Sequence, residues 1–335
     1  SDVIEIIVYD VFSVGNFFNR TDSDSRYVNH NSNTAGTDNF IAGNNAGDAI
    51  ASGGNYNTVV GNEAGTAITT GDNNTAVGFE ALSTEDANSN NTAVGYRALK
   101  TLNAGSDAYN TAVGADAGTS ITTGLYNNII GGLAGDAITT GDENIAIGVN
   151  ALTAETAGNK SIAIGGGSLA AQNSTSDTDM YNTAIGYHSG LSVTTGTSNT
   201  LIGALAGDAI TTSANNVAVG TSALTTNILS AKNVALWVNA LKTHNQGSST
   251  ESFNVAVGHN AGESLTTAQY STIIGGEAGD AITTGDRNTI VGYDALGAEV
   301  AGNYNVAVGM QALRSQTNSS GTDTRNTAVG YQAGY

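Results

Sequence analysis

Short apolar segments recur along the chain at a nearly constant spacing, and each has the same arrangement of polar and apolar positions. The motif is Asn-x-Ala-Val/Ile-Gly-x-x-Ala-Leu/Gly, as in NTAVGFEAL from Asn74 and NIAIGVNAL from Asn144. Its glycine position falls at residues 43, 61, 78, 95, 114, 131, 148, 165, 186, 203, 220, 237, 258, 275, 292, 309 and 330. Eleven of the sixteen intervals have a length of 17, and the others have lengths of 18, 19 and, three times, 21.

The 17-residue period predicts stacked β-coils rather than packed helices. It is too short for two helices and a turn, and the motif is rich in β-branched residues and glycine, which helices disfavour. Short strands joined by turns fit this length, with each coil hydrogen-bonded to the next at about 4.8 Å. We therefore expect an all-β parallel β-solenoid, or β-roll, of about 17 coils over residues 39–335. It should form a rod roughly 80 Å long with almost no helix.

The long intervals define a larger unit. They end at Gly186, Gly258 and Gly330, whose even spacing gives a 72-residue super-repeat of four coils. The second coil of each unit carries AGTAITTGD or AGDAITT, and the third carries Ala-Leu followed by variable polar residues. The fourth coil carries the extra residues.

The extra residues are polar and lie in segments 171–181, 243–253 and 315–325. They cannot enter a narrow coil without burying unpaired polar groups. We expect them to bulge outward as loops along one edge, with neighbours roughly 19 Å apart. The 19-residue interval predicts a shorter projection around 103–108.

Asparagine stands four residues before the glycine position in 15 of the 17 coils. In stacked coils its side-chain amide can bond the equivalent amides above and below, which predicts a structural ladder. A row of ligand-binding amides is the functional alternative. Glycine at the strand end permits positive φ or close backbone approach, and Trp237 replaces it in one coil. The asparagines assigned to the ladder are Asn74, Asn91, Asn110, Asn144, Asn182, Asn254 and Asn326.

The predicted strands are apolar on both faces. In Thr111–Gly114, Thr and Val point one way and Ala and Gly the other. In the second coil of each unit both central residues are large, as in Ile129-Ile130. One face can fill the coil interior, and the other then needs a partner. We expect a homotrimer with these strands near the shared axis, so that Ile129→Asp disrupts assembly and Asp136→Ala has little effect.

Composition narrows the class of partner. The chain has no Pro, which fits strand stacked on strand throughout, and no Cys, which removes disulfides and zinc–thiolate sites. Its net charge of −19 argues against binding to nucleic acid or to an anionic membrane surface. No apolar run approaches the roughly 20 residues of a membrane span, so membrane insertion is not expected.

No chemical motif stands out. A Ser-His-Asp arrangement, a phosphate loop and zinc spacing are all missing, so we assign no catalytic, cofactor or metal residue. Paired threonines such as Thr139-Thr140 suggest ice binding, but adjacent hydroxyls face opposite sides of a strand. The chain lacks the Gly-Gly-x-Gly-x-Asp pattern of calcium-binding β-rolls. We therefore interpret the acids of the second coils as solvated turn residues. These acids are Asp48, Asp136, Asp208 and Asp280.

The chain is expected not to be an enzyme. The enzymatic alternative, a tailspike that degrades polysaccharide, needs two carboxylates across a groove. Glu155 and Glu299 are the candidates, and their position in variable polar segments predicts that both are solvent-exposed.

The repeat resembles the head domain of trimeric autotransporter adhesins, whose Asn-Ser-Val-Ala-Ile-Gly-type motifs build a left-handed parallel β-roll shared by three chains. The likeness covers nearly the whole repeat region, from the first motif to Tyr335. The coils of that family are shorter than those of this chain and have no four-coil unit. The resemblance implies an adhesive trimer on a bacterial cell surface.

A second resemblance favours a bacteriophage tail fibre. Residues 1–14 resemble the closing strands of a small β-domain of such fibres, and Phe18–Val28 resembles their Thr-x-x-(acidic)-x-Arg-Tyr-Val linker. Repeats close to NTAVGYQAGY, as at 326–335, are also familiar there. The implied organisation is the end of an N-terminal β-domain over 1–18, a linker over 19–38 and a shaft over 39–335.

The tail-fibre resemblance implies a virion protein that attaches to the host cell through a surface glycan or protein. Tyr109, Tyr181 and Phe253, at the bases of the expected loops, are candidates for glycan contact. The sequence leaves two alternatives open: that the chain is a fragment of a longer protein, and that a receptor-binding tip follows Tyr335.

Overall fold

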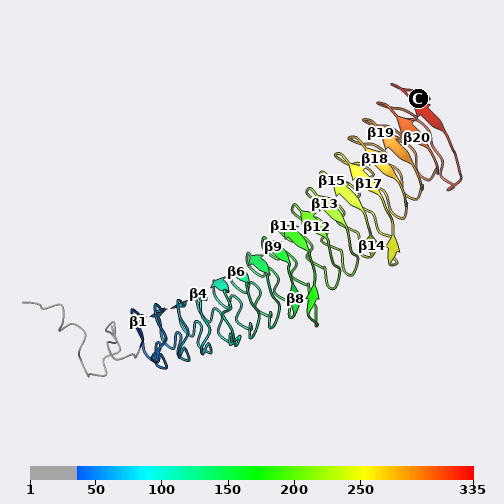
Figure 1. The fold of residues 1–335 in the computed structure, drawn as a ribbon. Coiled ribbons are helices and arrows are strands. Elements are labelled where there is room, and N and C mark those ends of the chain that lie inside the picture. The colour runs from blue at the N-terminus through cyan, green and yellow to red at the C-terminus, as the bar shows by residue number, and fades with distance from the viewer. Residues whose placement is uncertain (1–35) are drawn as a thin grey trace, which may run out of the picture.

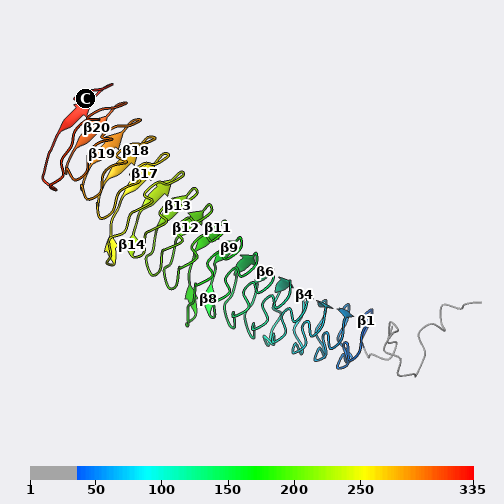
Figure 2. The same cartoon turned by 180° about the vertical axis from the view of Figure 1, so that it is seen from behind.

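Residues 36–335, the part of the chain described by the computed structural model, wind into a curved rod of stacked coils (Figures 1 and 2). This part contains 21 short strands and no helix. The expected parallel β-solenoid is therefore confirmed. The interpretations of residues 1–18 and of nearly all of the linker lie outside the described residues.

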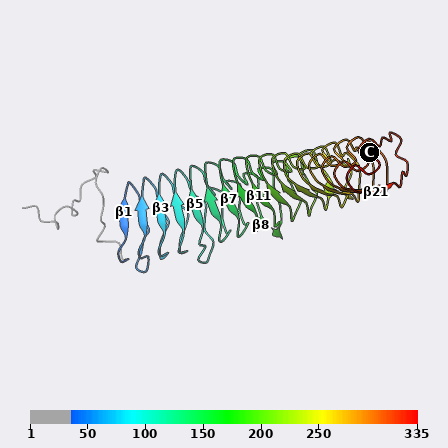
Figure 3. The same cartoon turned by 90° about the horizontal axis from the view of Figure 1, so that it is seen from above.

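One parallel sheet of 17 strands runs along the rod, and every coil contributes one three-residue strand to it (Figure 3). Neighbouring strands pair residue for residue, so that Ala112 lies opposite Ile129 and Val113 opposite Ile130. The strands of this sheet are β1 Phe40–Ala42, β2 Thr58–Val60, β3 Thr75–Val77, β4 Thr92–Val94, β5 Thr111–Val113, β6 Asn128–Ile130, β7 Ile145–Ile147, β9 Ile162–Ile164, β11 Thr183–Ile185, β12 Thr200–Ile202, β13 Val217–Val219, β15 Val234–Leu236, β17 Val255–Val257, β18 Thr272–Ile274, β19 Thr289–Val291, β20 Val306–Val308 and β21 Thr327–Val329.

Two smaller parallel sheets lie on the edge of the rod away from these strands (Figures 1 and 2). In one, β8 Gly158–Asn159 pairs with β10 Thr178–Asp179. In the other, β14 Ser230–Ala231 pairs with β16 Thr250–Glu251. A single bridge between Asn303 and Asp323 occupies the corresponding place in the last unit. Each pairing fastens the long fourth-coil loop to the third coil of its unit.

Columns of buried side chains fill the solenoid. They include the central strand residue, the small residue three positions after the bend glycine, and the residue four positions further on. Eight coils add a buried leucine directly after the small residue, as at Leu82 and Leu152. In one coil these are Ile129, Ala134 and Ile138, all fully buried. Burying one isoleucine side chain contributes about 1.5–3 kcal/mol, so the repeated columns account for much of the stability of the rod.

The chain leaves each strand through a sharp bend that requires glycine. Gly131 has a φ of 135°, and a Cβ added there would lie 2.6 Å from the carbonyl oxygen of Gly148 in the next coil. Trp237 is the one exception among the bend positions of the described residues, with a φ of 106° and an exposed side chain. The bend of this coil is therefore strained, by about 1–3 kcal/mol, whereas the other bends use glycine.

Candidate functional site

The outward side of the 17-stranded sheet is an apolar surface without charge. In each strand the central residue points into the coil, while the first and third point out. The outward residues are mostly Thr, Val and Ile, and none is charged. Ile130 is 41% exposed and Ile274 is 38% exposed. The third positions, which we call the outer stripe, are Ala42, Val60, Val77, Val94, Val113, Ile130, Ile147, Ile164, Ile185, Ile202, Val219, Leu236, Val257, Ile274, Val291, Val308 and Val329.

The expectation for Ile129 was wrong in its choice of face. Ile129 is completely buried inside its own coil, and the following residue, Ile130, belongs to the outer stripe. A charge at position 129 would therefore damage the coil itself, whereas a charge at position 130 would be placed on the exposed face. The two residues are both large and adjacent, so the apolar pattern could not distinguish them.

Asparagines form a buried ladder along the rod, but its bonds differ from the expected amide-to-amide chain. The side-chain oxygen of Asn74 accepts the backbone N–H of Asn91 at 2.9 Å. Its amide nitrogen donates to the carbonyl of Asn88, also at 2.9 Å. Amide-to-amide bonds occur at fewer positions, as between Asn127 and Asn110 at 3.2 Å. Each asparagine thus satisfies backbone groups at the turn that precedes the strand.

The other assigned asparagines occupy the same ladder. The side-chain oxygens of Asn91, Asn110, Asn144, Asn182 and Asn254 accept the N–H of the next coil at 2.8–3.1 Å. Asn326, in the last coil, donates its own N–H to Asn305 at 3.2 Å. All except Asn326 are buried, which leaves no amide row open to a ligand at those positions.

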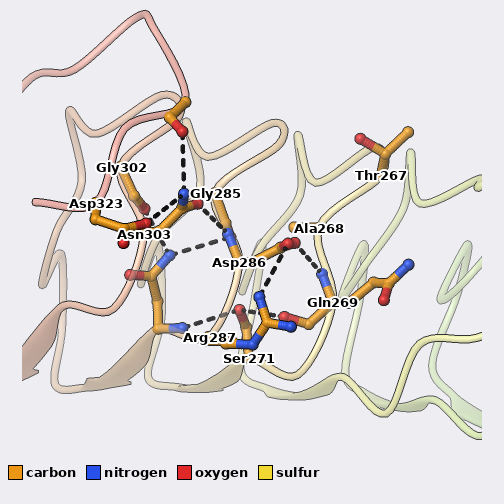
Figure 4. Close-up of polar contacts among 12 residues, drawn as sticks. Thr267, Ala268, Gln269, Ser271, Gly285, Asp286, Arg287, Gly302, Asn303 and Asp323 are labelled. Atoms are coloured by element: carbon orange, nitrogen blue, oxygen red, sulfur yellow. Dashed lines mark hydrogen bonds and ion pairs between the residues drawn. The ribbon is translucent and has the colours of Figure 1, made fainter.

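A second polar ladder runs outside the first and in the opposite direction (Figure 4). The N–H of Gln269 donates to the Asp286 carboxylate at 2.8 Å, and the N–H of Asp286 donates to the side-chain oxygen of Asn303 at 2.8 Å. Asn303 then donates to the carbonyl of Gly321 in the long loop at 3.0 Å. In the second unit, Asp142 and its neighbours repeat the pattern, and burial raises the pKa of the Asp142 carboxyl.

The residue before the ladder position is aromatic or cationic in eleven of the 17 coils, and these side chains form exposed rows. Tyr109 stacks on Tyr126, and Phe253 stacks on Tyr270, with ring centroids 5.8 Å apart in both pairs. Cations continue the row over the ring faces. Over the last six coils it reads Lys232, Phe253, Tyr270, Arg287, Tyr304 and Arg325.

This stacking changes the interpretation of the three glycan-contact candidates. The Lys232 ammonium lies 5.1 Å from the ring centroid of Phe253, whose other face packs on Tyr270. Lys160 lies 5.6 Å from the centroid of Tyr181, which also donates its hydroxyl to Asp179 at 2.7 Å. Tyr109 has one face covered by Tyr126. Because the flat faces of Phe253 are already occupied, stacking of a sugar ring on it would require the row to open.

The extra fourth-coil residues form loops with exposed tips and fixed bases. The exposed tips are 105–107, 175–177, 247–249 and 319–321. The small sheets hold the C-terminal sides of the loops at 171–181 and 243–253. The loop at 315–325 is held by the bond from the Asn303 side chain to the carbonyl of Gly321. The loops therefore project from the edge carrying the small sheets at the same point of successive units.

Buried glutamates anchor two of these loops. One oxygen of Glu155 accepts the N–H groups of Thr156, Ala157 and Gly158 and, from the loop, that of Ser174 at 3.0 Å. Its other oxygen accepts the Gln172 side chain at 2.8 Å. Glu299 makes the same set of bonds, including one of 3.0 Å from the N–H of Asn318. Both are fully buried, so the expectation that they are solvent-exposed was wrong.

The burial has a physical cause that the local composition does not reveal. Three successive backbone N–H groups converge on one point inside the coil, and a carboxylate there satisfies them all. Carboxylates used in this way have no free oxygen for a substrate. Glu155 and Glu299 therefore cannot serve as the paired carboxylates of a polysaccharide-degrading site.

The corresponding positions in the other two units are different. Leu102 takes the inward place beside Glu85 that Gln172 takes beside Glu155. One Glu85 oxygen has no hydrogen-bond partner among the described residues. Burial raises the pKa of Glu85. In the third unit, Asn227 and His244 replace the glutamate and glutamine, and burial lowers the pKa of His244 to about 4.

The threonine pairs and second-coil acids are surface features. The Thr139 hydroxyl donates to the carbonyl of Thr156 at 3.0 Å, while its neighbour Thr140 is exposed. Asp136 is half-buried and accepts the Thr153 hydroxyl at 2.6 Å. Within residues 36–335 no three metal-ligating side chains are grouped to hold an ion, and no helix could span a membrane.

These features describe a rod with an uncharged apolar face, an aromatic–cationic edge and a series of fastened loops. No protein-family model matches the chain, and a search of curated proteins finds no relative.

Proposed function

We propose that the chain is the shaft of an extracellular attachment fibre, of the kind that bacteriophages carry on their tails. Three copies would pack through their outer stripes, and the fourth-coil loops would project at fixed intervals. The uncharged face of the 17-stranded sheet is the observation that supports this most directly. A long exposed apolar face of this kind is characteristic of an interaction surface.

The charge distribution favours copies of this chain as the occupants of that face. The chain carries a net charge of −19, so two copies repel each other wherever their charged surfaces meet. The outer stripe carries none of that charge and extends over all 17 coils. A second rod with the same spacing can cover it from end to end. Three-fold packing also suits a fibre attached to a symmetric base.

A single charge should disrupt this packing. We expect Ile130→Asp to convert the assembly into monomers, because it places a carboxylate in the centre of the apolar contact at a cost of several kcal/mol. Sedimentation equilibrium measures the mass. Thr123→Asp is the control, since it adds the same charge at an exposed position away from the sheet face. A wild-type monomer in dilute buffer, or equal effects of the two variants, would contradict the proposal.

The attachment role is tested on virions and cells. Immunogold labelling should place the protein on phage tails, and antibody against it should reduce adsorption to the host. Labelling on the surface of uninfected bacteria would favour the alternative, an autotransporter-like adhesin. Release of oligosaccharide from bacterial surface polysaccharide would favour the tailspike alternative.

A further inference from the structure

His244 occupies an unusual place in the interior of the rod. The fourth coils of the four units carry Leu102, Gln172, His244 and Gln316 at this inward position. Gln172 and Gln316 donate to buried glutamates, at 2.8 and 2.7 Å. His244 is fully buried, and both of its ring nitrogens have no hydrogen-bond partner among the described residues.

The residue that replaces the glutamate cannot serve His244. Asn227 exchanges two hydrogen bonds with the backbone of Ser230, of 2.7 and 2.9 Å. Its oxygen accepts the N–H of Ser230, and its amide donates to the carbonyl of that residue. Ser230 in turn accepts the N–H of Gln246, in the loop, through its hydroxyl at 3.1 Å. The polar side chain on the preceding coil, Asn227, is thus neutral, and both of its polar atoms are already bonded to the backbone of Ser230.

Within residues 36–335, no charged side chain contributes to the pKa shift of His244, and the backbone of Thr266 is the one group that favours its protonated form. The charged side chains on the segments packed around it bond to one another outside the coil. Lys242 pairs with Glu263 at 3.2 Å, and Lys232 pairs with Glu251 at 2.6 Å. The following coil places Leu265 at the inward position. A positive charge on the imidazole would therefore be buried without a counter-charge.

We propose that His244 makes segment 243–253 an acid-sensitive latch, in which protonation of the buried imidazole releases this loop while the loops of the second and fourth units stay fastened. The latch does not depend on the attachment role. It involves one side chain and the loop whose base that side chain fills, and it distinguishes one unit of the chain from the others.

The direction of the effect follows from the two protonation equilibria. In the closed loop the pKa of His244 is about 4, and in the open loop the histidine returns to its ordinary value of about 6.5. The open form binds the proton more tightly, so opening is unaffected above pH 6.5 and becomes more favourable as the pH falls. The opening equilibrium should rise by up to about tenfold per pH unit, to roughly 150-fold at pH 4, and it should approach a limit of about 300-fold at lower pH.

The loop of the fourth unit is an internal control for this measurement. Segment 315–325 has Gln316 at the inward position and the Glu299 anchor beneath it. Hydrogen exchange monitored by mass spectrometry on the intact chain, at pH 7.0, 6.0, 5.0 and 4.5, gives the opening of both loops in one sample. Their ratio at each pH removes the pH dependence of the exchange chemistry.

In wild type, exchange of 243–253 relative to 315–325 should increase about sevenfold between pH 6.0 and 5.0. In His244→Gln, which installs the residue found at 172 and 316, the ratio should not change with pH. His244→Leu, matching Leu102, gives the same readout if the first variant does not fold. A constant ratio in wild type would overturn the proposal, and so would an equal rise in the variants.

Discussion

Replacement of Ile129 by Asp should unfold the coils around β6 at neutral pH. Ile129 is fully buried at the centre of its strand, between Ala112 and Ala146 of the adjacent coils. The change removes a core side chain and buries a carboxylate in an apolar column without a partner. We expect a loss of about 5 kcal/mol of local stability, which chemical denaturation and hydrogen exchange across β5–β7 would measure.

Ile130→Asp is the matched control for this prediction, because it introduces the same group one residue later. Ile130 is 41% exposed, so its replacement should leave the exchange of β5–β7 in the isolated chain nearly unchanged. Equal loss of coil stability in the two variants would show that the inward and outward faces are wrongly assigned. In Ile129→Asp, the coils next to β6 should lose stability before more distant coils, because the stability of a solenoid is largely a sum over adjacent repeats.

Glu155→Leu should release the loop at 171–181 from the rod. The substitution removes the acceptor of four backbone N–H groups and of the Gln172 amide. Each buried donor left without a partner costs about 1–3 kcal/mol, so the closed loop should lose several kcal/mol. Hydrogen exchange of 171–181 should increase by at least about 100-fold, while 315–325, held by Glu299, remains protected and serves as a reference.

Two further substitutions show whether the carboxylate itself is responsible. Glu155→Gln keeps one oxygen for the backbone N–H groups but turns a second donor toward Gln172, so an intermediate loss is expected. Asp177→Ala removes an exposed acid from the same loop, whose bond to Asn159 is 2.6 Å long, and should have a small effect. Unchanged protection of 171–181 in Glu155→Leu would contradict the role of Glu155 as an anchor.

The variation between units has a common physical basis. Every unit brings the third coil and the fourth-coil loop to the same internal position, but each fills it differently. Glu155 with Gln172, and Glu299 with Gln316, form complete polar pairs. Leu102 and His244 leave polar atoms without partners among the described residues of the first and third units. The loops of one rod should therefore open with different free energies and different responses to pH.

Much of the fold could be predicted from the sequence because its repeat is local. Asparagine and glycine, at constant positions of the 17-residue period, define the turn, the three-residue strand and the bend of each coil. The 72-residue unit likewise predicted which coils carry projecting loops, whose tips are exposed at 105–107, 175–177, 247–249 and 319–321. These properties depend on residue type and spacing alone, and the absence of proline agrees with them.

The tertiary structure decided those properties of a side chain that depend on its neighbours in the adjacent coils: its direction, its burial and its bonding partners. Ile129 and Ile130 have the same character in the sequence, and only the stacking turns one inward and the other outward. Glu155 looks like a solvated loop acid until three N–H groups converge on it inside the coil. Phe253 looks like an open ring until Lys232 and Tyr270 cover its faces. Such contacts join residues from neighbouring coils, so the chemistry of an inward or edge position is set by the residues above and below it.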